Sequence, residues 1–324
     1  MPAPATIVRA LCAVALCLLA QSSFAQSYPA RPVRVVVPWP AGIGPDTICR
    51  QVTQKLADRL GQPFVVDNKP GVAGHLGGEM VVRAAPDGHT LLCGVSTSFV
   101  TTPHVLPKLA YNPLNDLEPI SLVGRSQMVL VATPSLPVDD LPSLLAYMKA
   151  NPGKLSYASQ GIGSSNHLAM ELLKIKAGVT ATHVPYNAIG AAGDLVSGRV
   201  QLLFDPYVTS AQFIQTGKLK LVAVASGERL PDHPGVKTAQ ETIPGLELWG
   251  WAAFFAPVGT PRAIVEQLNV ELRKVLDTKD IKDSFSRMGF VTAGMPSEEA
   301  RRYIKSEYDR WGSVVRDANI KPEQ

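Results

Sequence analysis

The stretch VVVPWPAGIGPDTICR, residues 35–50, contains the end of a strand, a glycine loop and the start of a helix. The β-branched run Val33–Val37 predicts a buried parallel strand. Pro45 suits the first position of a helix, and Asp46 in the first turn complements the helix dipole. Apolar side chains then recur every four residues until Gly61 ends the helix. The stretch therefore predicts a strand–loop–helix unit, and the free N–H groups of such units commonly bind anions.

A second unit of the same kind follows in the middle of the chain. Lys154–Ala158 is strand-like, Ser159–Ser165 (SQGIGSS) is a glycine-containing loop, and Asn166–Ala177 has a helical pattern. Further strands are expected at residues 64–66, 89–93, 182–184 and 200–204, and long helices at 265–276 and 298–315. This alternation predicts an α/β fold with a doubly wound parallel sheet. Ligands bind at the carboxyl ends of the strands in such sheets, so both loops are expected to face a ligand.

The size and composition of the chain exclude several classes of function. Its 324 residues are enough for one large domain or two of ordinary size. The formal charge of +4 is too weak and too evenly spread to indicate nucleic-acid binding. The six histidines show no spacing typical of metal ligands, so we expect neither a metal nor a cofactor.

The N-terminus has the three regions of a secretory signal peptide. Arg9 supplies the positive charge, Ala10–Ala20 is an uninterrupted apolar run, and Ser23–Ala25 offers small residues before a cleavage point. We therefore predict that residues 1–25 are removed near Ala25 and that the mature protein is exported to the periplasm. No later apolar run reaches membrane-spanning length, so the mature protein is not expected to cross a membrane.

Cysteine usage leaves two alternatives open. Cys12 and Cys17 belong to the predicted signal peptide, so Cys49 and Cys93 remain in the mature chain. An oxidising compartment permits a disulfide between them. Cys49 also lies on the apolar side of the first helix pattern, where a buried free thiol is equally expected.

The two loops lack the residues that nucleotide-binding and hydrolytic motifs require. Neither loop ends in the lysine of a phosphate-binding Walker motif, and Thr47 and Asn166 stand where a dinucleotide fingerprint has its third glycine. The hydrolase motif G-x-S-x-G is absent from the sequence. We therefore predict no catalytic residues. Binding of a carboxylate through backbone N–H groups and the hydroxyls of Ser159 and Ser164 is the remaining interpretation. Ser164 or Ser165 is expected to be the N-cap of the following helix, and capping is the favoured role for Ser165.

A series of motifs in this order resembles a known receptor family. The segments are YPARPVRVVVPWPAGIGPD, LGQPFVVDNKPG, PDGHTLL, NPGKLSYASQGIGSSNHLA, HVPY, GKL and APVGTP. Together they are similar to the Bug family of extracytoplasmic solute receptors, the TctC-like receptors of tripartite tricarboxylate transport. The resemblance runs from Tyr28 to about Ile320. It implies a two-lobed periplasmic-binding-protein fold, the Venus flytrap, in which a cleft between the lobes closes over a small organic carboxylate.

The resemblance also implies how the chain is divided and which residues meet the ligand. Residues 26–127 with 249–324 are expected to form lobe 1, and residues 128–248 lobe 2. The predicted ligand-binding residues, taken from the two loops and nearby strand ends, are Trp39, Ala41, Gly42, Ile43, Gly44, Asp46, Ser96, Ser159, Gly161, Gly163, Ser164, Tyr186, Asn187 and Asp205. The receptor is expected to be a monomer that delivers its ligand to a tripartite membrane permease or reports it to a sensor protein.

Four departures from the family pattern bear on the ligand. The usual loop P-F-P-A-G-G-G-T-D has Trp39, Ile43 and Pro45 here, and Asn187 replaces a lysine. Proline and asparagine remove an N–H donor and a cation, which favours a monocarboxylate or an amphipathic acid over a citrate-like ligand. Equally, the unchanged loop at residues 159–165 alone could hold the ligand. The alternative functions are an exported hydrolase that uses a cleft serine, and a structural module without a ligand.

Overall fold

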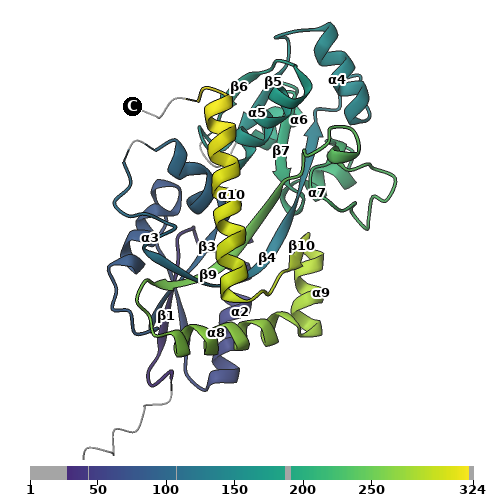
Figure 1. Ribbon diagram of the computed structural model, residues 1–324. Helices are drawn as coiled ribbons and strands as arrows, with labels where there is room; N and C mark the ends of the chain where they lie inside the picture. The colour runs from purple at the N-terminus through teal and green to yellow at the C-terminus, as the bar shows by residue number, and fades with distance from the viewer. Residues whose placement is uncertain (1–27, 43, 107, 187–190, 321–324) are drawn as a thin grey trace, which may run out of the picture.

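The computed structural model describes residues 28–42, 44–106, 108–186 and 191–320 (Figure 1). The predicted signal peptide at 1–25, and the predicted ligand residues Ile43 and Asn187, lie outside these ranges. The described strands form one ten-stranded sheet in the order β2-β1-β3-β9-β4-β7-β5-β6, and β8 and β10 also pair with β4. The α/β fold class that the alternation predicts is confirmed.

The opening stretch forms the predicted strand–loop–helix unit. Strand β1 (Val33–Val37) leads into helix α2 (Gly44–Leu60), and β2 (Phe64–Asn68), α3 (His75–Val82) and β3 (Thr90–Val95) follow. β1 lies between β2 and β3 and is parallel to both. The β-branched side chains of β1 are buried because helices cover both faces of this part of the sheet, which explains why the strand has an apolar run without alternation.

The second unit also forms as predicted. Strand β5 (Ser156–Ser159) leads through the loop into α5 (Ser165–Ala177), followed by β6 (Thr182–Pro185), α6 (Ala191–Val196) and β7 (Leu202–Pro206). β5 is parallel to β6 and β7. The remaining elements around this unit are α4 (Leu141–Ala150), α7 (Tyr207–Gln215) and β8 (Lys220–Val224).

The sheet is mixed rather than wholly parallel. The long strand β4 (Leu117–Ala132) is antiparallel to β9 (Trp249–Pro257) over Leu117–Gln127, and antiparallel to β7 from Met128 onward. β9 is also antiparallel to β3. The prediction of a parallel sheet is therefore wrong for the centre of the molecule. Local alternation of strands and helices could not show it, since these pairings join segments far apart in the chain.

The change of partner along β4 divides the sheet into two halves. We use "first half" for β1, β2, β3, β9, β10 (Phe290–Thr292) and residues 117–127 of β4. We use "second half" for β5, β6, β7, β8 and residues 128–132 of β4. The lobe boundaries at 127/128 and 248/249 remain a prediction, and they coincide in sequence with this change of partner.

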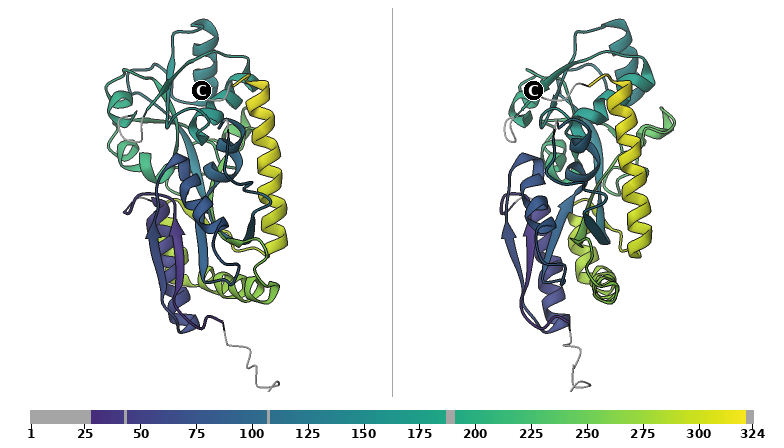
Figure 2. Two further views of the ribbon diagram at one scale, coloured as in Figure 1. Left: turned by 90° about the vertical axis from the view of Figure 1, so that its left-hand side faces the viewer. Right: turned by 60° about the vertical axis from the view of Figure 1, so that its left-hand side comes forward.

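The C-terminal helices complete the fold. α8 (Arg262–Leu276) and α9 (Lys279–Arg287) lie beside the first half, and α10 (Ser297–Asp317) extends along the molecule from one half toward the other (Figures 1 and 2). α10 contacts β4, α5, α8 and the helical turn at Thr97–Thr101. Its Trp311 is buried in the same core as Leu122 and Leu168, so a single apolar core continues through both halves.

Cys49 of α2 and Cys93 of β3 form a disulfide. Their Cα atoms are 6.2 Å apart, and both residues are buried in the core beside β1. The structure thus decides between the two alternatives for the cysteines. No helix in the described part of the chain is both long enough and apolar enough to cross a membrane.

Candidate functional site

The β1–α2 loop is held by Asp46. The residue is 1% exposed, and its carboxylate accepts hydrogen bonds from Gly42 N–H at 2.8 Å, Asn68 Nδ2 at 2.8 Å and Arg50 Nε at 2.9 Å. Burial raises the pKa of Asp46, but the bonds from Arg50, Gly42 and Asn68 outweigh it, so the pKa lies below its usual value. Asp46 is therefore an ionised acceptor whose hydrogen bonds hold the loop in place.

The other predicted residues of this loop have different environments. Gly42 N–H is occupied by Asp46, whereas Ala41 and Gly44 are exposed. Trp39 is half-buried against the core of the first half, and its backbone carbonyl accepts a bond from Asn68 at 2.9 Å. Its indole Nε1 is buried without a hydrogen-bond partner among the described residues. Among the described residues of this loop, the N–H of Gly42 is therefore already used by Asp46.

Ser159, the last residue of β5, is fully buried. Its Oγ accepts the N–H of Gly161 at 3.0 Å and lies 2.6 Å from Nε2 of His183. It also donates to the carbonyl of Gly161 at 3.1 Å. The hydroxyl that sequence reasoning assigns to the ligand is therefore engaged in holding the loop.

Ser164, rather than Ser165, is the N-cap of α5. Its Oγ accepts the N–H of His167 at 3.4 Å and donates to the carbonyl of Gly161 at 2.7 Å. Gly163 donates its N–H to Nδ1 of His167 at 3.0 Å. Of the two serines expected as the N-cap, Ser164 is therefore the one that caps the helix, and the N–H groups of Gly161 and Gly163 are both bonded locally.

The cap position determines which helix donors remain. The N–H groups of Ser164 and His167 are bonded within the loop, and among the described residues helix geometry leaves those of Ser165 and Asn166 without an intrahelical acceptor. The Ser165 hydroxyl lies 3.0 Å from Thr97 Oγ1, which follows β3. Sequence reasoning missed Ser165, Asn166 and Thr97 as site residues. The only signal is the choice of N-cap between two adjacent serines.

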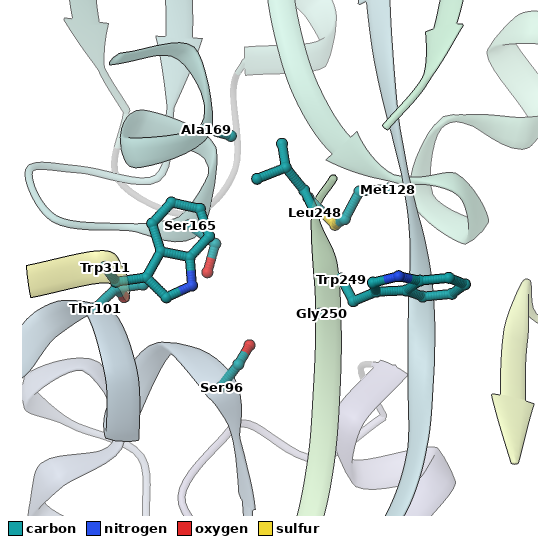
Figure 3. Close-up of a pocket in the computed structure, with 9 residues that line it drawn as sticks. All are labelled: Ser96, Thr101, Met128, Ser165, Ala169, Leu248, Trp249, Gly250 and Trp311. Carbon is teal, nitrogen blue, oxygen red and sulfur yellow. The ribbon is translucent and has the colours of Figure 1, made fainter. Parts of the chain in front are cut away.

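A small pocket adjoins the N-terminus of α5 (Figure 3). Three of its lining residues carry hydroxyl groups, and most of the others come from the region where β4, β9 and α10 meet. The residues are Ser96, Thr101, Ser165, Met128, Ala169, Leu248, Trp249, Gly250 and Trp311. Its volume of about 10 Å³ is room for a single water molecule. Of the predicted ligand residues that the structure describes, Ser96 alone lines it.

Asp205 and Tyr186 lie at two strand ends of the second half. Asp205 is 6% exposed in β7 and accepts a bond from Ser210 Oγ at 2.7 Å. Burial raises the pKa of Asp205 to about 7, although the Ser210 bond works in the opposite direction. Tyr186 follows β6 and donates its hydroxyl to Asp194 Oδ2 at 2.8 Å. Both side chains therefore have partners within the second half.

The loop from β5 also touches the first part of the chain. Gly163 has a φ of +75°, and a Cβ built on it would lie 2.0 Å from Cγ2 of Val105. Val105 is 2% exposed, so the contact is a packed one. Among residues 28–42, 44–106, 108–186 and 191–320, no three or more histidine, cysteine, aspartate or glutamate side chains are placed so that they could hold a metal ion.

Comparisons with known proteins place these features in a family. The model of the family described as "Tripartite tricarboxylate transporter family receptor" matches residues 48–320. The UPF0065 protein in the tcbD-tcbE intergenic region of Pseudomonas sp. strain P51 is 37% identical over 322 residues, covering 98% of this chain and 96% of the relative.

Solved structures agree with the sequence comparison. R. palustris Rpa4515 with adipate has a TM-score of 0.81 and 31% identity, covering 91% of this chain and 100% of that one. MatC (Rpa3494) from Rhodopseudomonas palustris with bound malate has a TM-score of 0.77 and 34% identity, covering 89% and 100%. The periplasmic binding protein BugD has a TM-score of 0.77 and 32% identity, covering 91% and 100%. The resemblance found in the sequence is confirmed: the chain has the two-lobed fold of periplasmic solute-binding proteins and belongs to the tripartite tricarboxylate transporter receptor (TctC) family of solute receptors.

Proposed function

We propose that this receptor binds a small organic carboxylate at the N-terminus of α5. The observation that carries the proposal is the pair of N–H groups at Ser165 and Asn166, which helix geometry leaves without an acceptor, whereas those of Gly161, Gly163 and Ser164 are bonded locally. Two such amides at the positive end of a helix dipole are suited to a carboxylate. The relatives whose structures contain adipate and malate support the same ligand class.

The site so proposed also includes the hydroxyl groups around those amides. Ser165 and Ser96 line the pocket at the end of α5, and Thr97, in the helical turn after β3, bonds to Ser165. The pocket has room for about one water molecule, so a larger ligand requires the surrounding side chains to move apart. The remaining predicted contacts stay part of the proposal: Trp39, Ala41, Gly42, Ile43, Gly44, Asp46, Ser159, Gly161, Gly163, Ser164, Tyr186, Asn187 and Asp205.

A proline substitution tests the amide donor without breaking the helix. Ser165 is the first residue of α5, where proline is tolerated, and Ser164 has the extended conformation (φ −64°, ψ 157°) that a following proline requires. Ser165→Pro removes both the amide hydrogen and the hydroxyl, whereas Ser165→Ala removes the hydroxyl alone. We expect Ser165→Pro to weaken carboxylate binding by about tenfold or more relative to Ser165→Ala, because hydrogen bonds to charged groups are the stronger ones.

The ligand itself is found with a thermal-shift panel. Adipate, malate, acetate, benzoate and citrate would be added to protein that has been unfolded and refolded to remove any bound ligand. A ligand at about 100 times its Kd adds about 2.7 kcal/mol to the free energy of unfolding. Stabilisation by citrate alone would contradict the preference for a monocarboxylate or amphipathic acid that Pro45 and Asn187 suggest. Equal binding by both serine variants would contradict the amide site.

Several further properties belong to the same proposal. The N-terminal pattern supports export to the periplasm with cleavage near Ala25, which the mass of the secreted protein would test. We propose that the lobes, residues 26–127 with 249–324 and residues 128–248, close on the ligand by bending near 127/128 and 248/249. We propose a monomer that serves a tripartite membrane permease or a sensor.

We propose no catalytic activity. Ser159 lies 2.6 Å from His183, as a serine nucleophile and its base would, but the serine is fully buried and its oxygen also bonds to Gly161. A substrate carbonyl could not reach it without unfolding the loop. The hydrolase alternative predicts turnover of ester or amide substrates that is lost in Ser159→Ala.

A further inference from the structure

Two histidines from different elements lie face to face behind the β5–α5 loop. His167 is in the first turn of α5 and His183 is in β6, with ring centroids 4.0 Å apart and ring planes inclined by 13°. Tyr157 of β5 stacks on His183 at 5.0 Å. Three elements of the second half therefore converge on one stacked pair of imidazoles.

Each imidazole is bonded to a different part of the loop. His167 Nδ1 accepts the N–H of Gly163 at 3.0 Å, so this nitrogen carries no proton and the neutral ring has its hydrogen on Nε2. His183 Nε2 bonds to Ser159 Oγ at 2.6 Å, and that oxygen accepts the N–H of Gly161 at 3.0 Å. The pair thus secures both glycine N–H groups, one directly and the other through Ser159.

The β5–α5 loop needs these hydrogen bonds because two of its glycines have positive φ angles. Gly161 has a φ of +107° and Gly163 a φ of +75°, which are conformations that residues with side chains rarely adopt. Glycine brings no side chain of its own to fix these angles, so hydrogen bonds and packing must do it. Because Ser165 and Asn166 follow directly, the direction of their amides depends on how the loop is held.

The surroundings keep the two imidazoles uncharged. Glu171 Oε1 is 3.9 Å from His167 Nε2, but the Glu171 carboxylate is also bonded to Lys174 Nζ at 2.7 Å and to the hydroxyl of Tyr157. Burial lowers the pKa of His167 to about 4, with the neighbouring imidazole and Lys174 acting in the same direction and Glu171 opposing them. Burial also lowers the pKa of His183. The rings are therefore free to act as neutral hydrogen-bonding groups at neutral pH.

We propose that His167 and His183 are positioning residues of the receptor: the stacked pair fixes the β5–α5 loop so that the amides of Ser165 and Asn166 face the bound carboxylate. The inference rests on the proposed carboxylate site and adds the residues that set its geometry. Neither histidine is expected to touch the ligand, since their loop-facing nitrogens are already bonded to Gly163 and Ser159.

Two substitutions at His167 separate its hydrogen bond from its packing. His167→Phe keeps an aromatic ring in the stack but has no acceptor for Gly163 N–H. His167→Asn places an amide oxygen near the position of Nδ1 and keeps an acceptor. His233→Phe makes the same chemical change at a histidine that packs on Tyr207, away from the loop, and serves as the control.

The first measurement needs no ligand: amide hydrogen exchange at Gly163, followed by NMR at pH 7. We expect His167→Phe to accelerate exchange at Gly163 by about tenfold or more, while His167→Asn and His233→Phe stay within about threefold of the unmodified protein. Unchanged exchange in His167→Phe would overturn the proposal. Equal acceleration in His167→Asn would also overturn it, since packing rather than the acceptor would then be responsible.

The second measurement uses adipate and malate as probes in isothermal titration calorimetry. His167→Phe should weaken binding by about tenfold, and His167→Asn should restore most of the affinity. The corresponding substitutions at His183 are His183→Phe and His183→Gln. Phenylalanine has neither a donor nor an acceptor for Ser159, whereas the side-chain amide of glutamine reaches the position of Nε2. Normal affinity in His167→Phe despite fast exchange at Gly163 would refute the positioning role. If the unmodified protein binds neither adipate nor malate, that result contradicts the proposed carboxylate site. The exchange rates at Gly163 still test whether His167 holds the loop.

Discussion

The contact between Gly163 and Val105 allows a quantitative test of how the β5–α5 loop packs against the first part of the chain. Gly163→Ala introduces a Cβ that would lie 2.0 Å from Cγ2 and 3.1 Å from Cβ of Val105. Overpacking of this kind costs about 1–3 kcal/mol. The backbone at Gly163, with φ +75°, adds roughly 1–2 kcal/mol for a residue with a side chain. We therefore expect Gly163→Ala to lower the free energy of unfolding by about 2–5 kcal/mol.

A double-mutant cycle separates the two contributions. Val105→Ala removes the two methyl groups and costs about 2–3 kcal/mol by itself, because Val105 is 2% exposed. In that background the overlap is relieved, and Gly163→Ala should cost only the roughly 1–2 kcal/mol of backbone strain. Urea unfolding of the four proteins should give a coupling energy of about 1–3 kcal/mol. Additive effects, with no coupling, would refute the packed contact. Gly153→Ala, at a φ of +74° with nothing within 4 Å, is the matched control for strain alone.

Three other predictions follow from the buried groups. Replacing Cys49 and Cys93 by alanine should lower the free energy of unfolding by about 4 kcal/mol, since the disulfide closes a loop of 44 residues. Urea unfolding with and without reductant measures this difference. A free energy of unfolding that does not change with reductant would contradict the disulfide. Asp46→Ala should lower the free energy of unfolding by about 2–4 kcal/mol, because Gly42 and Asn68 lose their acceptor. Arg50→Ala, which removes a half-exposed side chain, should lower it by about 1 kcal/mol or less. Equal losses in the two variants, measured by urea unfolding, would contradict the role of Asp46 in holding the loop. Burial raises the pKa of Asp205 to about 7, above its value of 3.8 when unfolded, so the folded state binds the extra proton and this contribution to stability is lost as pH rises from about 4 to 7. Asp205→Asn should therefore gain in Tm relative to the unmodified protein as pH rises from about 4 to 7, and a constant difference across that range would count against a buried carboxyl.

The parts of the fold that depend on local patterns could be predicted. The apolar run at Val33–Val37 and the four-residue spacing in the helices at 262–276 and 297–317 follow from burial of one segment against its neighbours. The pairing of β9 with β3 and β4 could not, because it joins residues such as Cys93 and Phe254, which are far apart in the chain. Local alternation of strands and helices contains no information about such pairs.

The sequence could predict where the candidate site lies, but it could not predict which groups there are free to contact a ligand. Glycine loops before two helices indicated where a carboxylate binds, but which donors stay free depends on distant partners. His183 engages Ser159 from 24 residues away, and Asn68 engages Asp46 from 22. These partners occupy groups that the loop sequence alone assigns to the ligand. The shift from Ser159 and Ser164 to Ser165 therefore needs the folded structure, and the contact of each with a ligand remains a prediction.

The long helix α10 has a consequence for the biogenesis of the protein. It follows the other helices of the described residues in sequence, yet its Ile304, Trp311 and Val315 belong to the core that also contains residues of both sheet halves. A chain emerging from the ribosome or an export channel therefore cannot complete this shared core until residues 297–317 are available. Completion of the core must wait for α10, while the bond between Cys49 and Cys93 needs only residues that are made much earlier. A chain cut before residue 297 would leave that apolar core uncovered, and such a product is a natural substrate for proteases.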